Sequence, residues 1–242
     1  MLTPSQALLA ASVVALGTAV QASIGFGLAM IAAPVLYLIE PGLVPGPLIA
    51  CALFLSIWVA WHERHAIDMQ YFGAALAGRL IGSPLAAILL GSLSALAFDL
   101  VFGSLVLLAV LLSLIHPRIL LSSRTVFAAT LLSGLMGTLS SIGGPPLALV
   151  YQHVRGPALR ANLSVLFVLG TLISLASLFT VGRFGQAELQ ASAWLALGIV
   201  PGIVLSPPLK RHMDSRSVRP YLLLMCVLSA VAVLLRALYE FA

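Results

Sequence analysis

Two short stretches rich in glycine and serine interrupt the apolar runs of this chain, and their residue types suit ligand binding. The first contains Gln21, Ser23, Ile24, Gly25, Phe26 and Gly27, and the second contains Ser140, Ser141, Ile142, Gly143, Gly144 and Pro145. Hydrocarbon cannot satisfy non-helical peptide groups, so such stretches must line a cavity or meet other protein. Glycine also lets a ligand approach the backbone closely. Each stretch is followed by a predicted helix, whose free N–H groups and positive dipole end point at the stretch. The pattern therefore predicts an anion site.

Polar side chains around these stretches each allow two interpretations. The hydroxyls of Ser23, Ser140 and Ser141 either donate to an oxyanion or cap the short helices. Gln21 either lines a pore as a donor or joins two helices by a hydrogen bond. Asn162 either faces the second stretch or is an ordinary polar residue at a helix end.

One charged residue, Arg79, lies near the middle of the apolar run 69–90. Burying a charge there costs at least about 2.5 kcal/mol on insertion scales, so the guanidinium must be compensated. Either the substrate anion supplies the compensation, or Asp99 in the following run pairs with Arg79, and the two are not exclusive.

Other chemistries find little support in the sequence. The stretch His62-Glu63-Arg64-His65 lacks the second histidine of a zinc-protease motif, because position 66 is alanine. The chain contains neither the nucleophile elbow of serine hydrolases nor the phosphate loop of ATPases. Both cysteines lie in apolar runs, which does not favour a disulfide scaffold or a metal site. We therefore expect no enzyme activity and no cofactor.

The elements that position these residues must be membrane helices. Of 242 residues, 61% are apolar or aromatic and 8% are charged, whereas a soluble domain carries roughly 25% charged residues. We expect one all-α integral membrane domain over residues 1–242, and we attribute the net charge of +5 to cytoplasmic loops rather than to nucleic-acid binding. Pro, Gly and charged residues divide the chain into ten apolar segments: 5–21, 26–39, 43–62, 69–90, 93–115, 124–140, 145–154, 157–181, 190–210 and 217–238.

Two of these segments are too short to cross a membrane alone. As helices, 26–39 and 145–154 cover about 21 Å and 15 Å of an apolar core roughly 30 Å thick. Each directly follows one of the Gly/Ser stretches. We expect each to form, with its predecessor, a discontinuous helix or a re-entrant pair.

The chain shows signs of an internal duplication. Ser23-Ile24-Gly25 recurs 118 residues later as Ser141-Ile142-Gly143, and Gly78-x-x-x-Gly82 recurs 120 residues later as Gly198-x-x-x-Gly202. These offsets predict two five-segment repeats, about 5–115 and about 124–238. The paired glycines lie inside full-length segments, which favours a role in helix packing.

The basic residues predict the sidedness. If segments alternate sides, nine of the 12 basic residues fall in the connections after the third, fifth, seventh and ninth segments. The positive-inside rule places that face in the cytoplasm and both termini outside. Because each half has five segments, the second half starts on the opposite side. The repeats are then inverted, as in many secondary transporters.

The two half-repeats, QASIGFGLAMIAAP from Gln21 and SSIGGPPLALVY from Ser140, resemble the sulfite exporter TauE/SafE family of bacterial membrane transporters. The resemblance covers essentially the whole chain and is closer at the second stretch, since the first lacks the fuller glycine run of some members. It implies export of sulfite, a sulfonate or a related sulfur-containing anion across the bacterial cytoplasmic membrane.

The resemblance implies two partners, the anion and membrane lipid, and leaves a homo-oligomer open. Alternating access is the expected mechanism, with the anion at the two helix breaks near the midplane. Four alternatives remain: a transporter of another small anion, an importer, an intramembrane enzyme and a non-transporting assembly factor.

Overall fold

The computed structural model describes residues 3–115, 119–213, 224 and 227–235. All regular secondary structure in these residues is helical, as the composition predicts. Residues 227–235 form a helical stretch, and short 3-10 turns lie at Pro41–Leu43 and Arg64–Ala66. The α-helices between Pro4 and Met213 are α1 Pro4–Ile24, α2 Leu28–Ile39, α3 Gly46–His62, α4 Phe72–Ser92, α5 Ala95–Leu114, α6 Ser123–Ser140, α7 Gly144–Val150, α8 Gly156–Thr180, α9 Gln186–Ala196 and α10 Ile199–Met213.

Six helical stretches of the described chain are long and apolar enough to cross a membrane, by length and composition. By contrast α2 has 12 residues and α7 has seven, or about 18 Å and 10 Å of helix. Both are shorter than an apolar bilayer core of roughly 30 Å, as expected from the sequence.

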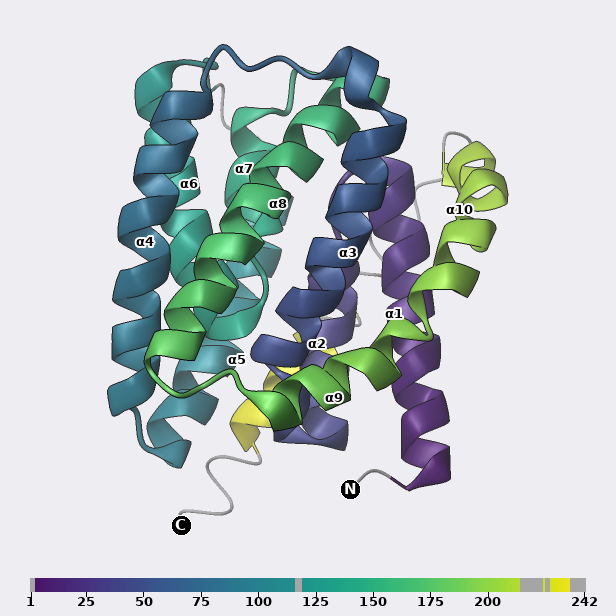
Figure 1. Ribbon diagram of the computed structural model, residues 1–242, viewed down its shortest axis with the longest axis vertical. Coiled ribbons are helices and arrows are strands. Elements are labelled where there is room, and N and C mark those ends of the chain that lie inside the picture. The colour runs from purple at the N-terminus through teal and green to yellow at the C-terminus, as the bar shows by residue number, and fades with distance from the viewer. Residues whose placement is uncertain (1–2, 116–118, 214–223, 225–226, 236–242) are drawn as a thin grey trace.

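The long helices form a bundle in which α3 and α8 pack together in the middle (Figure 1). The pair α4 and α6 flanks this centre on one side, and α1 with α10 flanks it on the other. The short helices α2 and α7 lie between these groups.

Each short helix folds back along the long helix before it. A Cβ atom added at Gly17 of α1 would lie 2.8 Å from the carbonyl oxygen of Leu28, the first residue of α2. A Cβ at Gly137 of α6 would lie 3.4 Å from the Cα of Gly143, just before α7. Of the two predicted arrangements, the structure therefore has the hairpin.

The glycines of α4 pack this helix tightly against α6. A Cβ at Gly78 would lie 2.6 Å from the carbonyl oxygen of Phe127, and one at Gly82 would lie 2.3 Å from that of Leu131. Only a residue without a side chain permits this approach. The order of these contacts shows that α4 and α6 run parallel.

The second glycine pair makes the same kind of contact between α10 and α1. Added Cβ atoms at Gly198 and Gly202 would lie 2.3 Å and 2.5 Å from the carbonyl oxygens of Ala11 and Ala15. These two helices also run parallel. The predicted packing role of both glycine pairs is confirmed.

Several predicted boundaries need correction. Segment 190–210 is not one helix, because a turn at Leu197 and Gly198 separates α9 from α10. Helix α7 ends at Val150, four residues before the predicted end of its segment. Most of segment 217–238 lies outside the described residues.

The first Gly/Ser stretch is also less irregular than predicted, because Ser23 and Ile24 belong to α1. The break is confined to residues 25–27, where Gly25 and Gly27 have φ angles of 96° and 129°. Side chains disfavour that backbone region, so these two positions require glycine.

Candidate functional site

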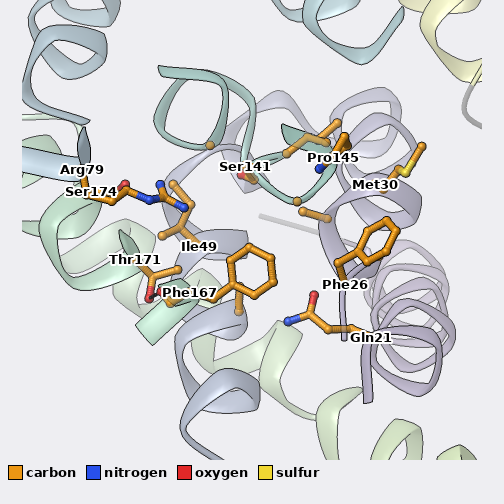
Figure 2. A pocket seen from close by; sticks show the side chains of 17 residues that line it. Gln21, Phe26, Met30, Ile49, Arg79, Ser141, Pro145, Phe167, Thr171 and Ser174 are labelled. Atoms are coloured by element: carbon orange, nitrogen blue, oxygen red, sulfur yellow. Dashed lines mark hydrogen bonds between the residues drawn. The ribbon is translucent and has the colours of Figure 1, made fainter. Parts of the chain in front are cut away.

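A small cavity lies between the two helix hairpins, where both Gly/Ser stretches meet α3, α4 and α8 (Figure 2). Its volume is about 40 Å³, roughly three times the minimum for one water molecule. It therefore has room for an anion of a few atoms. Its lining consists of Gln21, Phe26, Gly27, Ala29, Met30, Ile49, Ala52, Arg79, Gly137, Ser141, Ile142, Gly143, Gly144, Pro145, Phe167, Thr171 and Ser174.

Most of the predicted site residues come together in this cavity. The first stretch contributes Gln21, Phe26 and Gly27, and α4 contributes Arg79. The second stretch contributes the run 141–145. Residues about 120 positions apart in the sequence thus share one lining, because each hairpin returns its short helix to the centre of the bundle.

Two predicted serines do not line the cavity. The Ser23 hydroxyl lies 2.7 Å from the carbonyl oxygen of Ala19 and 3.1 Å from that of Ser206, so it joins α1 to α10. The Ser140 hydroxyl donates to the carbonyl oxygen of Met136 at 2.8 Å. Both therefore satisfy helix backbone, whereas Ser141 lines the cavity.

Ile24, Gly25 and Asn162 also lie outside the lining. Gly25 packs on α8 instead, where an added Cβ would lie 3.4 Å from the Cα of Arg160. The Asn162 side-chain oxygen accepts the backbone N–H of Asp68 at 2.7 Å, which ties the start of α8 to the loop before α4. Asn162 thus has the role of a polar residue at a helix end.

The guanidinium of Arg79 extends from α4 toward the cavity (Figure 2). Arg79 is 3% exposed. Its Nη1 donates to the carbonyl oxygen of Ser133 at 3.1 Å and its Nη2 to the Ser133 hydroxyl at 2.8 Å. Its Nε has no hydrogen-bond partner among the described residues. A buried donor without an acceptor is costly, so a ligand at this position would be stabilised.

The predicted pair between Arg79 and Asp99 is wrong. The Asp99 carboxylate accepts a hydrogen bond from the Tyr37 hydroxyl, and the one ion pair of the described residues joins Arg160 to Glu63. Arg79 is the only charged residue among the described residues that line the cavity. The cavity is consequently electropositive without a compensating carboxylate.

The backbone offers fewer free donors than the sequence pattern indicates. The N–H of Leu28, which begins α2, donates to the side-chain oxygen of Gln21 at 3.1 Å. In α7, Pro145 and Pro146 have no N–H. The N–H of Ile142 donates to the Ser140 hydroxyl at 3.4 Å. The positive charge of the site thus comes from Arg79 rather than from amides alone.

Helix α8 supplies a wall of the cavity that sequence reasoning missed. Phe167, Thr171 and Ser174 recur at helical spacing and face the cavity together. Two polar residues at this spacing in an apolar helix were the available signal. Gly170 belongs to the same region, because an added Cβ there would lie 2.4 Å from the Cζ of Arg79.

The comparison with protein families agrees with this architecture. The family model described as sulfite exporter TauE/SafE matches residues 9–233, nearly the whole chain.

The chain belongs to the sulfite exporter TauE/SafE family.

The resemblance carried by the two half-repeats is thereby confirmed, and the apolar helices are those of a multi-pass membrane protein in a transporter family. No curated protein and no solved structure matches the chain.

Proposed function

We propose that this TauE/SafE protein exports a small sulfur-containing oxyanion across the bacterial cytoplasmic membrane, with the anion held in the cavity between the two hairpins. One observation carries the proposal: the buried Nε of Arg79 has no partner among the described residues. An oxyanion would supply the missing acceptor and balance a charge that has no carboxylate beside it. Export as the direction is supported by the family description.

The rest of the lining suits such an anion. The side-chain oxygen of Gln21 is occupied by Leu28, so its amide nitrogen is left as a donor. Phe26 and Phe167 form apolar walls that limit water and strengthen electrostatic attraction. A volume of about 40 Å³ favours sulfite or a comparably small oxyanion over a sulfonate with a long organic tail.

The inverted repeat is part of the proposal, because it supplies the alternating access. In its support, the fourth segment of each half packs through a glycine pair on the first helix of the other half: α4 on α6, and α10 on α1. Helix α1 starts at the lower end of Figure 1, whereas α4, and the parallel α6, start at the upper end. We place both termini outside, with the loop containing residues 210–219 in the cytoplasm.

Flux of radiolabelled sulfite into proteoliposomes tests the proposal. We expect saturable, protein-dependent uptake by the wild type and at least a tenfold loss in Arg79→Met. Arg155→Met is the matched control, since it removes an exposed arginine at the start of α8, and it should transport normally.

The rivals predict different results. A non-transporting assembly factor gives no sulfite-dependent flux from well-folded wild-type protein. A transporter of another anion gives no sulfite flux but responds to a different solute. An importer shows the opposite direction in oriented vesicles.

A further inference from the structure

A second, larger cavity lies at the end of the bundle where α4 turns into α5 and α8 turns into α9, the lower end in Figure 1. Its volume is about 460 Å³. Under the proposed topology this end faces outside the cell. We call this cavity the vestibule, and its polar and charged lining residues are Tyr37, Ser94, Asp99, Arg183 and Glu188.

The vestibule adjoins the anion cavity. Pro45 lines the vestibule, and its carbonyl oxygen accepts a hydrogen bond at 3.0 Å from Ser141, which lines the anion cavity. Helix α2 also connects the two, since its first turn lines the anion cavity and Tyr37 near its end lines the vestibule. An anion that crosses this end of the bundle therefore passes the vestibule charges.

The described lining of the vestibule carries two carboxylates and one guanidinium, a balance that is unfavourable for an anion. The Glu188 carboxylate accepts the backbone N–H of Gly185 at 2.8 Å and caps α9. Arg183 donates to the carbonyl oxygen of Leu90 at 3.3 Å and forms no ion pair with Asp99. Like charges repel most strongly in low-dielectric surroundings. Glu188 is partly exposed to water, whereas Asp99 is buried, so an anion passes easily only if the buried carboxylate is neutralised.

Of the two vestibule carboxylates, Asp99 has the position suited to taking up a neutralising proton. It is 9% exposed and lies on α5, one of the apolar spans. Ionisable residues inside spans mark ion and proton pathways. Its one hydrogen-bond partner among the described residues is the hydroxyl of Tyr37, which is 4% exposed.

The other groups around Asp99 do not compete for this role. Glu40, at the end of α2, accepts the N–H of Gly42 at 3.5 Å. Helix α6, which also packs on α5, has its one charged residue, Arg124, in its first turn. Helix α7 and residues 227–235 pack on α5 as well and carry no titratable side chain. The described residues contain no cluster of three or more His, Cys, Asp or Glu that could hold a metal ion. A proton therefore suits Asp99 better than a metal cation.

We propose that Asp99 is a proton-binding site that couples anion transport to proton movement, so that one proton crosses with each anion. In export, the Asp99 carboxylate takes up a proton on the cytoplasmic side together with the anion and becomes a neutral carboxylic acid. When the anion leaves through the vestibule, the proton passes to the water outside, and uptake into vesicles runs the same steps in reverse. The Tyr37 hydroxyl donates to Oδ1 of Asp99, so the proton binds at Oδ2. Because Tyr37 belongs to α2, whose first turn lines the anion cavity, protonation of Asp99 is coupled to that cavity. The inference rests on the proposed function.

Accumulation of radiolabelled sulfite in proteoliposomes tests this proposal, with choline salts replacing Na⁺. The medium is made one pH unit more acidic than the lumen. With one proton per anion, that difference raises steady-state accumulation by the wild type up to about tenfold over vesicles at equal pH. A pH dye outside should report that the medium becomes more alkaline as sulfite enters. Protein-free vesicles correct for sulfite that enters without the protein.

The variants separate coupling from transport. In Asp99→Asn the accumulation ratio should no longer depend on the pH difference, whereas Asp99→Glu should retain the dependence. Glu188→Gln is the matched control, a second vestibule carboxylate that serves as a helix cap, and it should respond like the wild type. Sulfite counterflow at equal pH measures sulfite transport without a pH difference, so it tests the proposed function independently of proton coupling.

Two results would overturn the coupling. The first is a wild type with normal counterflow but no pH-driven accumulation. The second is full pH-driven accumulation by Asp99→Asn. Absence of counterflow from the wild type would instead contradict the proposed function itself.

Discussion

Gly170 of α8 offers a direct way to move the Arg79 guanidinium without removing it. A methyl group in Gly170→Ala would lie 2.4 Å from Cζ and 2.5 Å from Nε of Arg79. Because non-bonded heavy atoms rest about 3.5 Å apart, the guanidinium must retreat by about 1 Å. The guanidinium is the far end of a flexible side chain, so it moves rather than the backbone, and the protein should still fold.

The size of the effect follows from the hydrogen bonds of this group. A retreat of about 1 Å breaks at least one charge-assisted hydrogen bond to the bound anion, worth about 1.5–3 kcal/mol. At 1.4 kcal/mol per tenfold, the affinity for sulfite should fall about 10- to 100-fold. Isothermal titration calorimetry on the purified protein measures this directly.

The control is Gly91→Ala in α4, where the new methyl group meets the Cβ of Val181 at 3.8 Å, an ordinary contact. It should leave sulfite affinity unchanged. If Gly170 acts through Arg79, adding Gly170→Ala to Arg79→Met should cost nothing further. An equal loss in both backgrounds, or wild-type affinity in folded Gly170→Ala, would refute the reasoning.

The remaining predictions concern packing and sidedness. Gly82→Ala places a methyl group 2.3 Å from the carbonyl oxygen of Leu131. It should destabilise the protein by about 1–3 kcal/mol, visible as a lower Tm in detergent, whereas Gly73→Ala, which meets nothing within 4 Å, should not. Sidedness reporters fused at Ala242 and inserted near Ser215 should report opposite faces of the membrane, and a cytoplasmic Ala242 would contradict the inverted repeat.

The helical fold and the two breaks could be predicted from the sequence because their signals are local. Low charge content, long apolar runs and the glycines at 25, 27 and 143 mark membrane helices and interrupted backbone without any knowledge of contacts. The packing role of the pairs Gly78/Gly82 and Gly198/Gly202 could also be predicted, because helices that pack closely need small residues four positions apart.

The contacts around Arg79 could not be predicted in the same way. An apolar membrane helix carries little periodicity, so its sequence does not reveal which face meets which neighbour. Arg79 therefore looked equally able to reach Asp99, whereas its guanidinium lies against Ser133 of α6 and Gly170 of α8. The serines were ambiguous for a related reason, because a serine hydroxyl bonds its own helix backbone as readily as a ligand.

The central claim is that an oxyanion occupies the cavity beside Arg79. Selenite is the heavier analogue of sulfite, and its anomalous scattering locates it directly in crystals of the protein. The account predicts a selenium peak in the cavity, within hydrogen-bond distance of the Arg79 guanidinium, and its loss in Arg79→Met. A peak elsewhere, or one that persists in Arg79→Met, would contradict it.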